Sequence, residues 1–147
     1  MNKNSVFLAQ TDTTVGFLSS DCRKLSRVKN RVISKKMLQI VDSFTTLKQK
    51  SRVPKKFRKF IRNSKKSTFI YPNGDSYRVV AKESKHYDFV KKFKVLYSTS
   101  ANVTNKSFDK KYALNSCDIS IETSEPYVQK TSSSIFKITT TGILKQR

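Results

Sequence analysis

Two short polar pairs in the sequence could hold a polyphosphate. Lys29 and Arg31 stand two residues apart in "KNR", and Ser100 and Asn102 stand two residues apart in "SAN". On an extended segment, residues two apart project from one face, so each pair can contact one anion together. The first pair supplies cations and the second supplies neutral donors and acceptors, which could position a triphosphate without covalent chemistry. Each pair alone is a weak signal, because Lys-x-Arg is frequent on basic surfaces and Ser/Asn clusters often form turns.

The sequence contains few residues that could support other kinds of catalysis. The only histidine, His86, lies between Lys85 and Tyr87, and there is no G-x-S-x-G motif. Ten scattered acidic residues argue against a carboxylate metal cluster, and three glycines cannot supply a Walker A or G-x-G-x-x-G loop. Cys22 and Cys117 lack the neighbours of a zinc site or a disulfide framework. We assign no role to His86 or to either cysteine, and a bound nucleotide would have to be held by side chains.

The charge of the chain predicts a polyanionic partner. Thirty-one Lys and Arg residues against ten Asp and Glu give a formal net charge of +21, far more than solubility requires. Such an excess attracts nucleic acid over long range and contacts phosphates without reading a base sequence. RNA is therefore the expected partner. The alternative interpretation, a solvated face that merely carries many lysines, stays open.

Length and hydropathy predict one domain, residues 1–147, with one core. The chain has 147 residues, of which 36% are hydrophobic. No run approaches the roughly 20 apolar residues of a membrane span, and the start "MNKNSVFLAQTDTT" lacks the features of a signal peptide. We therefore expect a cytoplasmic protein that does not contact a membrane.

Strand-like and helix-like segments alternate along the chain, which predicts an α/β fold with a mixed sheet. Strands, including two hairpins, are expected within residues 5–11, at both ends of 29–41, and within 67–81, 94–99, 117–123 and 132–147. Helices are expected after a cap at Ser20 or Asp21, after Asp42 or Ser43, and within 54–66, 83–93 and 105–114. Residues 12–21 are predicted to form a loop. The clearest local signal is Asn73-Gly74, a tight-turn dipeptide between two β-rich runs.

Five segments resemble motifs of the Sua5/YciO/YrdC family and occur in the same order. "QTDTTVGFL" resembles P-T-D/E-T-x-Y-G-L, "KNRVISKKMLQIV" resembles K-x-R-x-x-x-x-P-L, and "STFIYPNGDSYRVV" is similar to P-x-T-x-I-L and v-R-x-P. "STSANVTN" resembles T-S-A-N-x-S-G, and "SSSIFKITTTGILKQR" resembles the closing S-T-v-v-d and I-L-R-x-G motifs. The ordered set spans nearly the whole chain, so it is a stronger signal than any one motif.

The resemblance implies a single YrdC-like domain with a twisted, open sheet of parallel and antiparallel strands flanked by short helices. It also implies an L-threonylcarbamoyladenylate synthase, which makes threonylcarbamoyl-AMP from L-threonine, bicarbonate and ATP for the t6A modification of tRNA. Mg²⁺ would arrive on the ATP phosphates, with no metal ligand from the protein. The implied macromolecular partners are tRNA or other double-stranded RNA and a separate threonylcarbamoyl transferase.

Site residues follow from the resemblance, position by position. The K-x-R…S-x-N tetrad around ATP, which also carries the catalytic role, corresponds to Lys29, Arg31, Ser100 and Asn102. Further contacts with ATP are implied for Thr68 and Lys145. The threonine site would contain Thr11, Thr13, Arg78 and Ser134, with Arg78 as the partner of the threonine carboxylate.

The sequence departs from the family pattern at five motif positions. Gln10 replaces a proline, Val15 a tyrosine, Met37 a proline, Asn105 a glycine and Lys145 an arginine. These departures keep a second hypothesis open, a non-catalytic YrdC-like protein that binds RNA and acts on tRNA or in ribosome maturation. A third hypothesis is an unrelated basic protein. A sheet without a polar pocket beside the "SAN" segment would support it.

Overall fold

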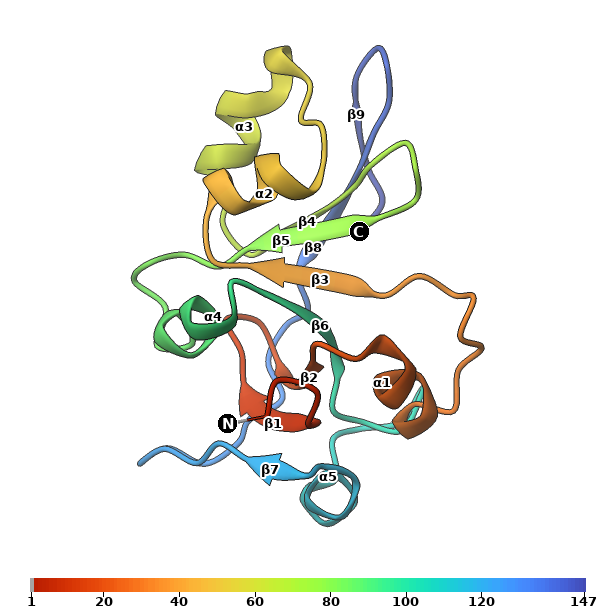
Figure 1. The fold of residues 1–147 in the computed structure, drawn as a ribbon, viewed down its shortest axis with the longest axis vertical. Helices are drawn as coiled ribbons and strands as arrows, with labels where there is room; N and C mark the ends of the chain where they lie inside the picture. Colours follow the sequence, from red (N-terminus) through yellow and green to blue (C-terminus); the bar gives the residue numbers. More distant parts are fainter. Residues whose placement is uncertain (1) are drawn as a thin grey trace.

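A mixed β-sheet organises the chain (Figure 1). The structure is a computed structural model that describes residues 2–147. Within these residues there are nine strands: β1 (Phe7–Gln10), β2 (Val15–Ser19), β3 (Leu38–Val41), β4 (Ser67–Ile70), β5 (Ser76–Val79), β6 (Val95–Ser100), β7 (Ile119–Ser120), β8 (Ser134–Ile138) and β9 (Ile143–Lys145). Their order across the sheet is β7-β1-β2-β6-β3-β5-β4-β8-β9. The pairs β1/β7, β3/β5 and β4/β8 are parallel and the others antiparallel, so the predicted mixed sheet is confirmed.

Short helices flank the sheet, and polar side chains cap three of them. They are α1 (Cys22–Val28), α2 (Phe44–Lys50), a 3₁₀ turn at Lys55–Phe57, α3 (Arg58–Asn63), α4 (Tyr87–Phe93) and α5 (Lys110–Ser116). The Asp21 carboxylate accepts hydrogen bonds from the first turn of α1, and the Ser43 hydroxyl does the same for α2. Both residues were among the predicted caps. No helix in residues 2–147 has the length and apolar character that crossing a membrane requires.

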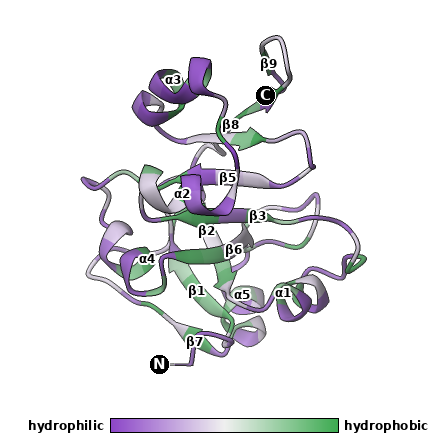
Figure 2. Cartoon of the chain, turned by 45° about the horizontal axis from the view of Figure 1, so that its top comes forward, coloured by the Kyte–Doolittle hydropathy of each residue, from purple (hydrophilic) through white to green (hydrophobic). Residues whose placement is uncertain are grey.

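Alternating strand residues supply separate parts of the core. On β1, Leu8 packs with residues of α1 and α5, whereas Phe7 packs on the opposite face with residues of α4. On β4 and β5, Phe69 and Tyr77 join the cluster beneath α2 and α3. Each such fully buried large side chain contributes about 1.5–3 kcal/mol. Figure 2 shows the hydrophobic residues gathered on the central strands, while α3 is largely hydrophilic.

The same alternation decides which residues can form a site. Because Phe69 and Tyr77 face α2 and α3, their neighbours Thr68 and Arg78 face the other side of the sheet. Both are buried polar side chains. The fold therefore places a hydroxyl and a guanidinium on a face that α2 and α3 leave uncovered.

Two expectations about local structure were wrong. Residues 12–21 are not one loop, because Val15–Ser19 is strand β2, which is buried along its whole length between β1 and β6. Residues 29–37 are not strand-like, and Asn30 has a positive φ of 52°. Lys29 and Arg31 therefore do not share a face of an extended segment. The hairpins around Asn73-Gly74 and Gly142 are confirmed.

Candidate functional site

A polar cleft of about 270 Å³ lies on the face of the sheet opposite α2 and α3. It is lined by residues from the β1–β2 turn, the segment after α1, five central strands (β2 to β6) and the C-terminal segment. Six residues predicted for the site line it: Thr11, Thr13, Arg31, Thr68, Arg78 and Ser100. Segments far apart in the sequence thus meet in one place, including the end of β6 where "SAN" begins.

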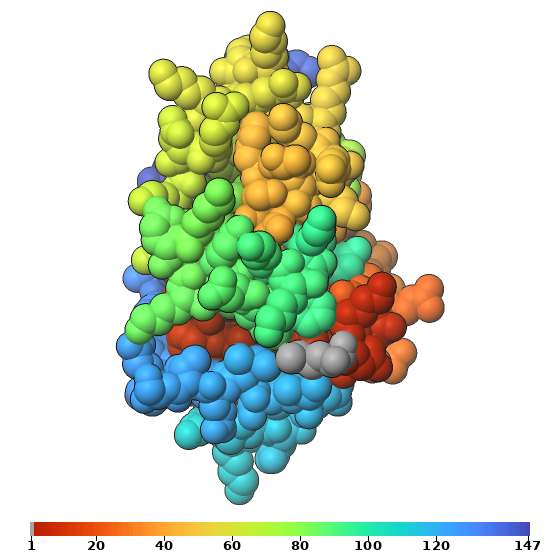
Figure 3. Space-filling model, turned by 60° about the vertical axis from the view of Figure 1, so that its left-hand side comes forward, coloured from red at the N-terminus to blue at the C-terminus, as the bar shows by residue number. Residues whose placement is uncertain are grey.

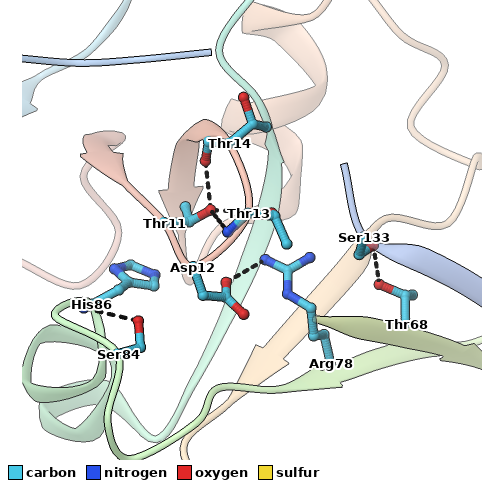
Figure 4. A network of polar contacts seen from close by, with 9 residues as sticks. All are labelled: Thr11, Asp12, Thr13, Thr14, Thr68, Arg78, Ser84, His86 and Ser133. Atoms are coloured by element: carbon cyan, nitrogen blue, oxygen red, sulfur yellow. Dashed lines mark hydrogen bonds and ion pairs between the residues drawn. The ribbon is translucent and has the colours of Figure 1, made fainter. Parts of the chain in front are cut away.

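Hydroxyl groups of the β1–β2 turn shape one wall of the cleft. The Thr11 hydroxyl donates to the backbone oxygen of Thr14 and accepts from the backbone N–H of Thr13 at 3.1 Å (Figure 4). Thr11 and Thr13 are buried. Gly16 follows, and a Cβ there would meet the Thr99 carbonyl oxygen at 3.0 Å and Thr11 Cγ2 at 3.2 Å. A larger residue here would crowd β6 and the β1–β2 turn, so glycine suits this position of β2.

Arg78 reaches the cleft already paired with a carboxylate. Its Nη2 atom lies 3.1 Å from Asp12 Oδ1, and the two side chains are 4% and 6% exposed. The Nε–H of Arg78 has no hydrogen-bond partner among residues 2–147. Figure 4 shows Arg78 between Asp12 on one side and the pair Thr68 and Ser133 on the other. Arg78 therefore keeps an unused donor while Asp12 compensates its charge.

In the C-terminal part of the cleft, Ser133 and Arg147 take the places predicted for Ser134 and Lys145. Ser133 lines the cleft and its hydroxyl lies 2.8 Å from the Thr68 hydroxyl, whereas Ser134 does not line it and begins β8. Arg147 lines the cleft and donates from Nε and Nη2 to the Ser133 carbonyl oxygen, whereas Lys145 is exposed on β9. The planar fork that the family motif places in this segment is thus present at Arg147. The presence of an arginine two residues after Lys145 was the sequence signal that could have predicted a role for Arg147 in the cleft.

Lys29 and Asn102 lie beside the cleft and hold the end of β6. The Lys29 ammonium donates to the carbonyl oxygens of Ser100 and Asn102, and it lies 3.5 Å from Asn102 Oδ1. The Asn102 amide donates to the carbonyl oxygens of Val103 and Lys106. Burial, together with the nearby charge of Arg31, lowers the pKa of Lys29. Three members of the predicted tetrad are therefore in direct contact, and Arg31 is the member that lines the cleft as a cation.

Solved structures give an independent comparison of the fold. P. abyssi Sua5 complexed with L-threonine matches with a TM-score of 0.78 and 14% identity, over 98% of this chain and 50% of that one. E. coli YciO matches with a TM-score of 0.77 and 14% identity, over 99% of this chain and 83% of that one. The chain has the Sua5/YciO fold. This likeness confirms the fold that the five ordered motifs indicated.

The likeness to Sua5 and YciO rests on structure. No protein-family model matches the sequence, and no curated protein matches it. The chain spans about half the length of the P. abyssi Sua5 chains that it matches. The predicted roles of individual side chains therefore stay predictions, and the geometry of the cleft supplies their support.

Lys29 offers a direct test of how the Sua5/YciO fold holds the end of β6. Lys29→Met keeps the aliphatic stem but leaves the part-buried carbonyl oxygens of Ser100 and Asn102 without their cationic donor. We expect a loss of about 1–3 kcal/mol in the free energy of unfolding, measured by urea denaturation. Arg23→Met, at an exposed position of α1, which Lys29 directly follows, is the matched control and should leave the midpoint unchanged. Equal midpoints for both variants would show that the Lys29 contacts do not stabilise the fold.

His86 lies outside the cleft. Because its imidazole is buried, we expect the stability of the fold to depend on pH. Burial lowers the pKa of His86 from an ordinary value of 6.5 to about 4. The unfolded chain therefore binds a proton between pH 6.5 and pH 4 that the folded chain excludes, so stability falls as pH drops through this range. The loss is about 3 kcal/mol. Urea unfolding at several pH values should show a steeper loss for the native chain than for His86→Phe, and parallel curves would contradict the assignment.

Proposed function

We propose that the chain is an L-threonylcarbamoyladenylate synthase that uses L-threonine, bicarbonate and ATP. The observation that carries the proposal is the single cleft that gathers Arg31, Ser100 and Thr68 with Thr11, Thr13 and Arg78. The first three are the positions expected to contact ATP, and the others those expected to contact threonine. That P. abyssi Sua5 with this fold was solved complexed with L-threonine supports the choice of substrate.

The proposed reaction needs positioning and charge compensation above all. An N-carboxylated threonine attacks the α-phosphate of ATP through a carboxylate oxygen, and the bond to pyrophosphate breaks. The attacking group is already an anion, so no histidine or carboxylate base is required at the cleft. Arg31 has no carboxylate partner within residues 2–147 and is free to neutralise phosphate charge, while Mg²⁺ accompanies the nucleotide.

The proposed threonine site lies at the β1–β2 turn. Arg78 lines the cleft, so its guanidinium can donate to the threonine carboxylate while Asp12 continues to hold Nη2. The Thr13 hydroxyl lies 3.3 Å from that of Thr11 and stands at the same wall, where it can contact the substrate hydroxyl. Ser133, next to the predicted Ser134, joins this set because it faces the cleft beside Thr68. Val15, which replaces the tyrosine of the motif, packs in the core with Leu8 and Phe17 and does not line the cleft.

The decisive experiment is incubation of the protein with ATP, Mg²⁺, bicarbonate and labelled L-threonine, followed by detection of pyrophosphate and threonylcarbamoyl-AMP. Omission of threonine is the control, since a contaminating ATPase would release phosphate without it. Threonine-dependent formation of both products is the expected result. A folded protein that gives neither product is not a synthase, and the RNA-binding alternative would then take its place. A separate transferase that moves the threonylcarbamoyl group to tRNA is part of the proposal.

Binding to RNA is the second candidate function, favoured by the net charge of +21. The basic side chains include exposed Lys55, Lys56 and Lys59 around the 3₁₀ turn and α3. If they bind phosphates, Lys55→Ala, Lys56→Ala and Lys59→Ala combined should weaken RNA binding. The slope of log affinity against log salt should fall by about 1 for each phosphate that is no longer neutralised. Fluorescence anisotropy with a tRNA at several salt concentrations measures this slope.

The control for RNA binding lies at the other end of the molecule. Lys110 and Lys111 begin α5, which Figure 1 shows far from α3. Their double substitution by alanine removes two exposed charges instead of three, and the slope should change less for each charge removed. Equal effects per charge removed would mean that RNA binds no particular face. Neither variant touches the cleft, so adenylate formation should persist in both.

A further inference from the structure

A second cavity of about 460 Å³ lies beside the cleft and takes no part in the proposed reaction. Its floor is the end of β1 and the following turn, from Ala9 to Asp12. Its sides are the segment that leads into α4 and the segment after β7. In Figure 3 the red N-terminal atoms are seen at the bottom of a groove between the green α4 segment and the blue segment after β7. The cavity is large enough for a small organic ligand.

Two residues that line this cavity carry buried polar atoms without hydrogen-bond partners among residues 2–147. His86 lines it, is only 5% exposed, and its Nε2 atom has no hydrogen-bond partner within residues 2–147. Gln10 also lines it, and its Nε2 atom is buried without a partner while its Oε1 accepts from the Val128 N–H. An unpartnered buried donor or acceptor costs about 1–3 kcal/mol. A polar ligand that reaches these two groups would complete their hydrogen bonds.

The residues of the walls and of the rim indicate the chemical class of the ligand. Phe89, Ile121 and Pro126 give the cavity apolar walls. Four lysines stand around it, and two of them are paired, Lys65 with Glu83 and Lys85 with Glu125. Lys66 and Lys130 have no carboxylate partner within residues 2–147. The rim therefore favours an anion, and the walls favour a flat apolar body.

We propose that this second cavity binds a nucleoside monophosphate. A heterocyclic base offers a flat body for the apolar walls and an edge of alternating donors and acceptors. That edge can meet a neutral imidazole and a carboxamide, which a simple aromatic acid would leave unpaired. The phosphate then lies at Lys66 and Lys130. The site differs from the cleft, from which Thr11 and the Asp12–Arg78 ion pair separate it.

The single histidine of the chain makes the test direct. Titration of the full chain with AMP should shift the one imidazole Cε1–H resonance in proton NMR until it saturates. Lys66→Ala combined with Lys130→Ala should weaken AMP binding about tenfold or more, because the phosphate then has two fewer cationic partners. Lys35→Ala combined with Lys137→Ala removes the same charge elsewhere and should leave the affinity unchanged. Arg31→Ala, a change in the cleft, should also leave the imidazole shift unchanged.

Three results would overturn the proposal. The first is an imidazole resonance that does not move at millimolar AMP. The second is an equal response to inorganic phosphate, which would reduce the site to a patch that binds any anion. The third is loss of the AMP response in Arg31→Ala but not in the double lysine variant, which would place AMP in the cleft. None of these results depends on threonine-dependent adenylate formation, so a failed synthase assay and a failed second site are distinguishable.

Discussion

Arg31→Ala is expected to lower threonine-dependent pyrophosphate release about 100-fold or more. Arg31 is the cation of the K-x-R pair that lines the cleft without a carboxylate partner among the described residues. A triphosphate bound beside it would lose the charge that balances the departing pyrophosphate, and this loss is larger in the transition state than in the bound substrate. The effect should therefore appear mainly in kcat, measured with a coupled pyrophosphate assay under saturating ATP.

The neighbouring loop supplies a matched control for Arg31. Lys35→Ala removes an exposed cation four residues further on, and Lys35 does not line the cleft. This variant should retain nearly full activity and the same urea midpoint as the native chain. If both variants lose activity equally, general attraction between ATP and a basic protein explains the loss. If Arg31→Ala remains active, the guanidinium has no role in the reaction.

Local patterns predicted those parts of the fold that local forces determine. The tight turn at Asn73-Gly74 needs a positive φ, which Gly74 has at 89°, and flanking β-rich runs then pair across it. Asp21 and Ser43 cap helices because their short side chains reach backbone N–H groups of the first turn. Strand β2 was missed because both of its faces are buried, which removes the period-two alternation that marks a strand.

The site needed information that local patterns do not contain. Lys29 contacts a segment 71 residues away, and nothing near Lys29 encodes that meeting. The choice between Ser133 and Ser134 depends on which of two adjacent side chains faces the cleft, which follows from the register of β8 against β4. Only the ordered resemblance to known motifs brought the distant segments together. It carried no information on the ion pair of Arg78, because pairing depends on where the β1–β2 turn lies over β5.

Asp12→Ala is expected to cost about 3–5 kcal/mol in the free energy of unfolding. The Asp12–Arg78 pair is buried, so removal of the carboxylate leaves a guanidinium charge without compensation in a poorly solvated place. Urea denaturation at neutral pH measures the loss. The exposed pair of Lys85 and Glu125 is the matched control, and Glu125→Ala should leave the midpoint unchanged because water screens that pair.

The double variant Asp12→Leu with Arg78→Met separates stability from function. Replacement of both charges by apolar groups of similar size removes the uncompensated charge, so most of the stability lost in Asp12→Ala should return. Adenylate formation should not return, because the proposed partner of the threonine carboxylate is gone. Recovery of both stability and activity would show that the reaction does not need the Arg78 guanidinium. Recovery of stability alone would show that the fold does not need the guanidinium and that the proposed reaction does.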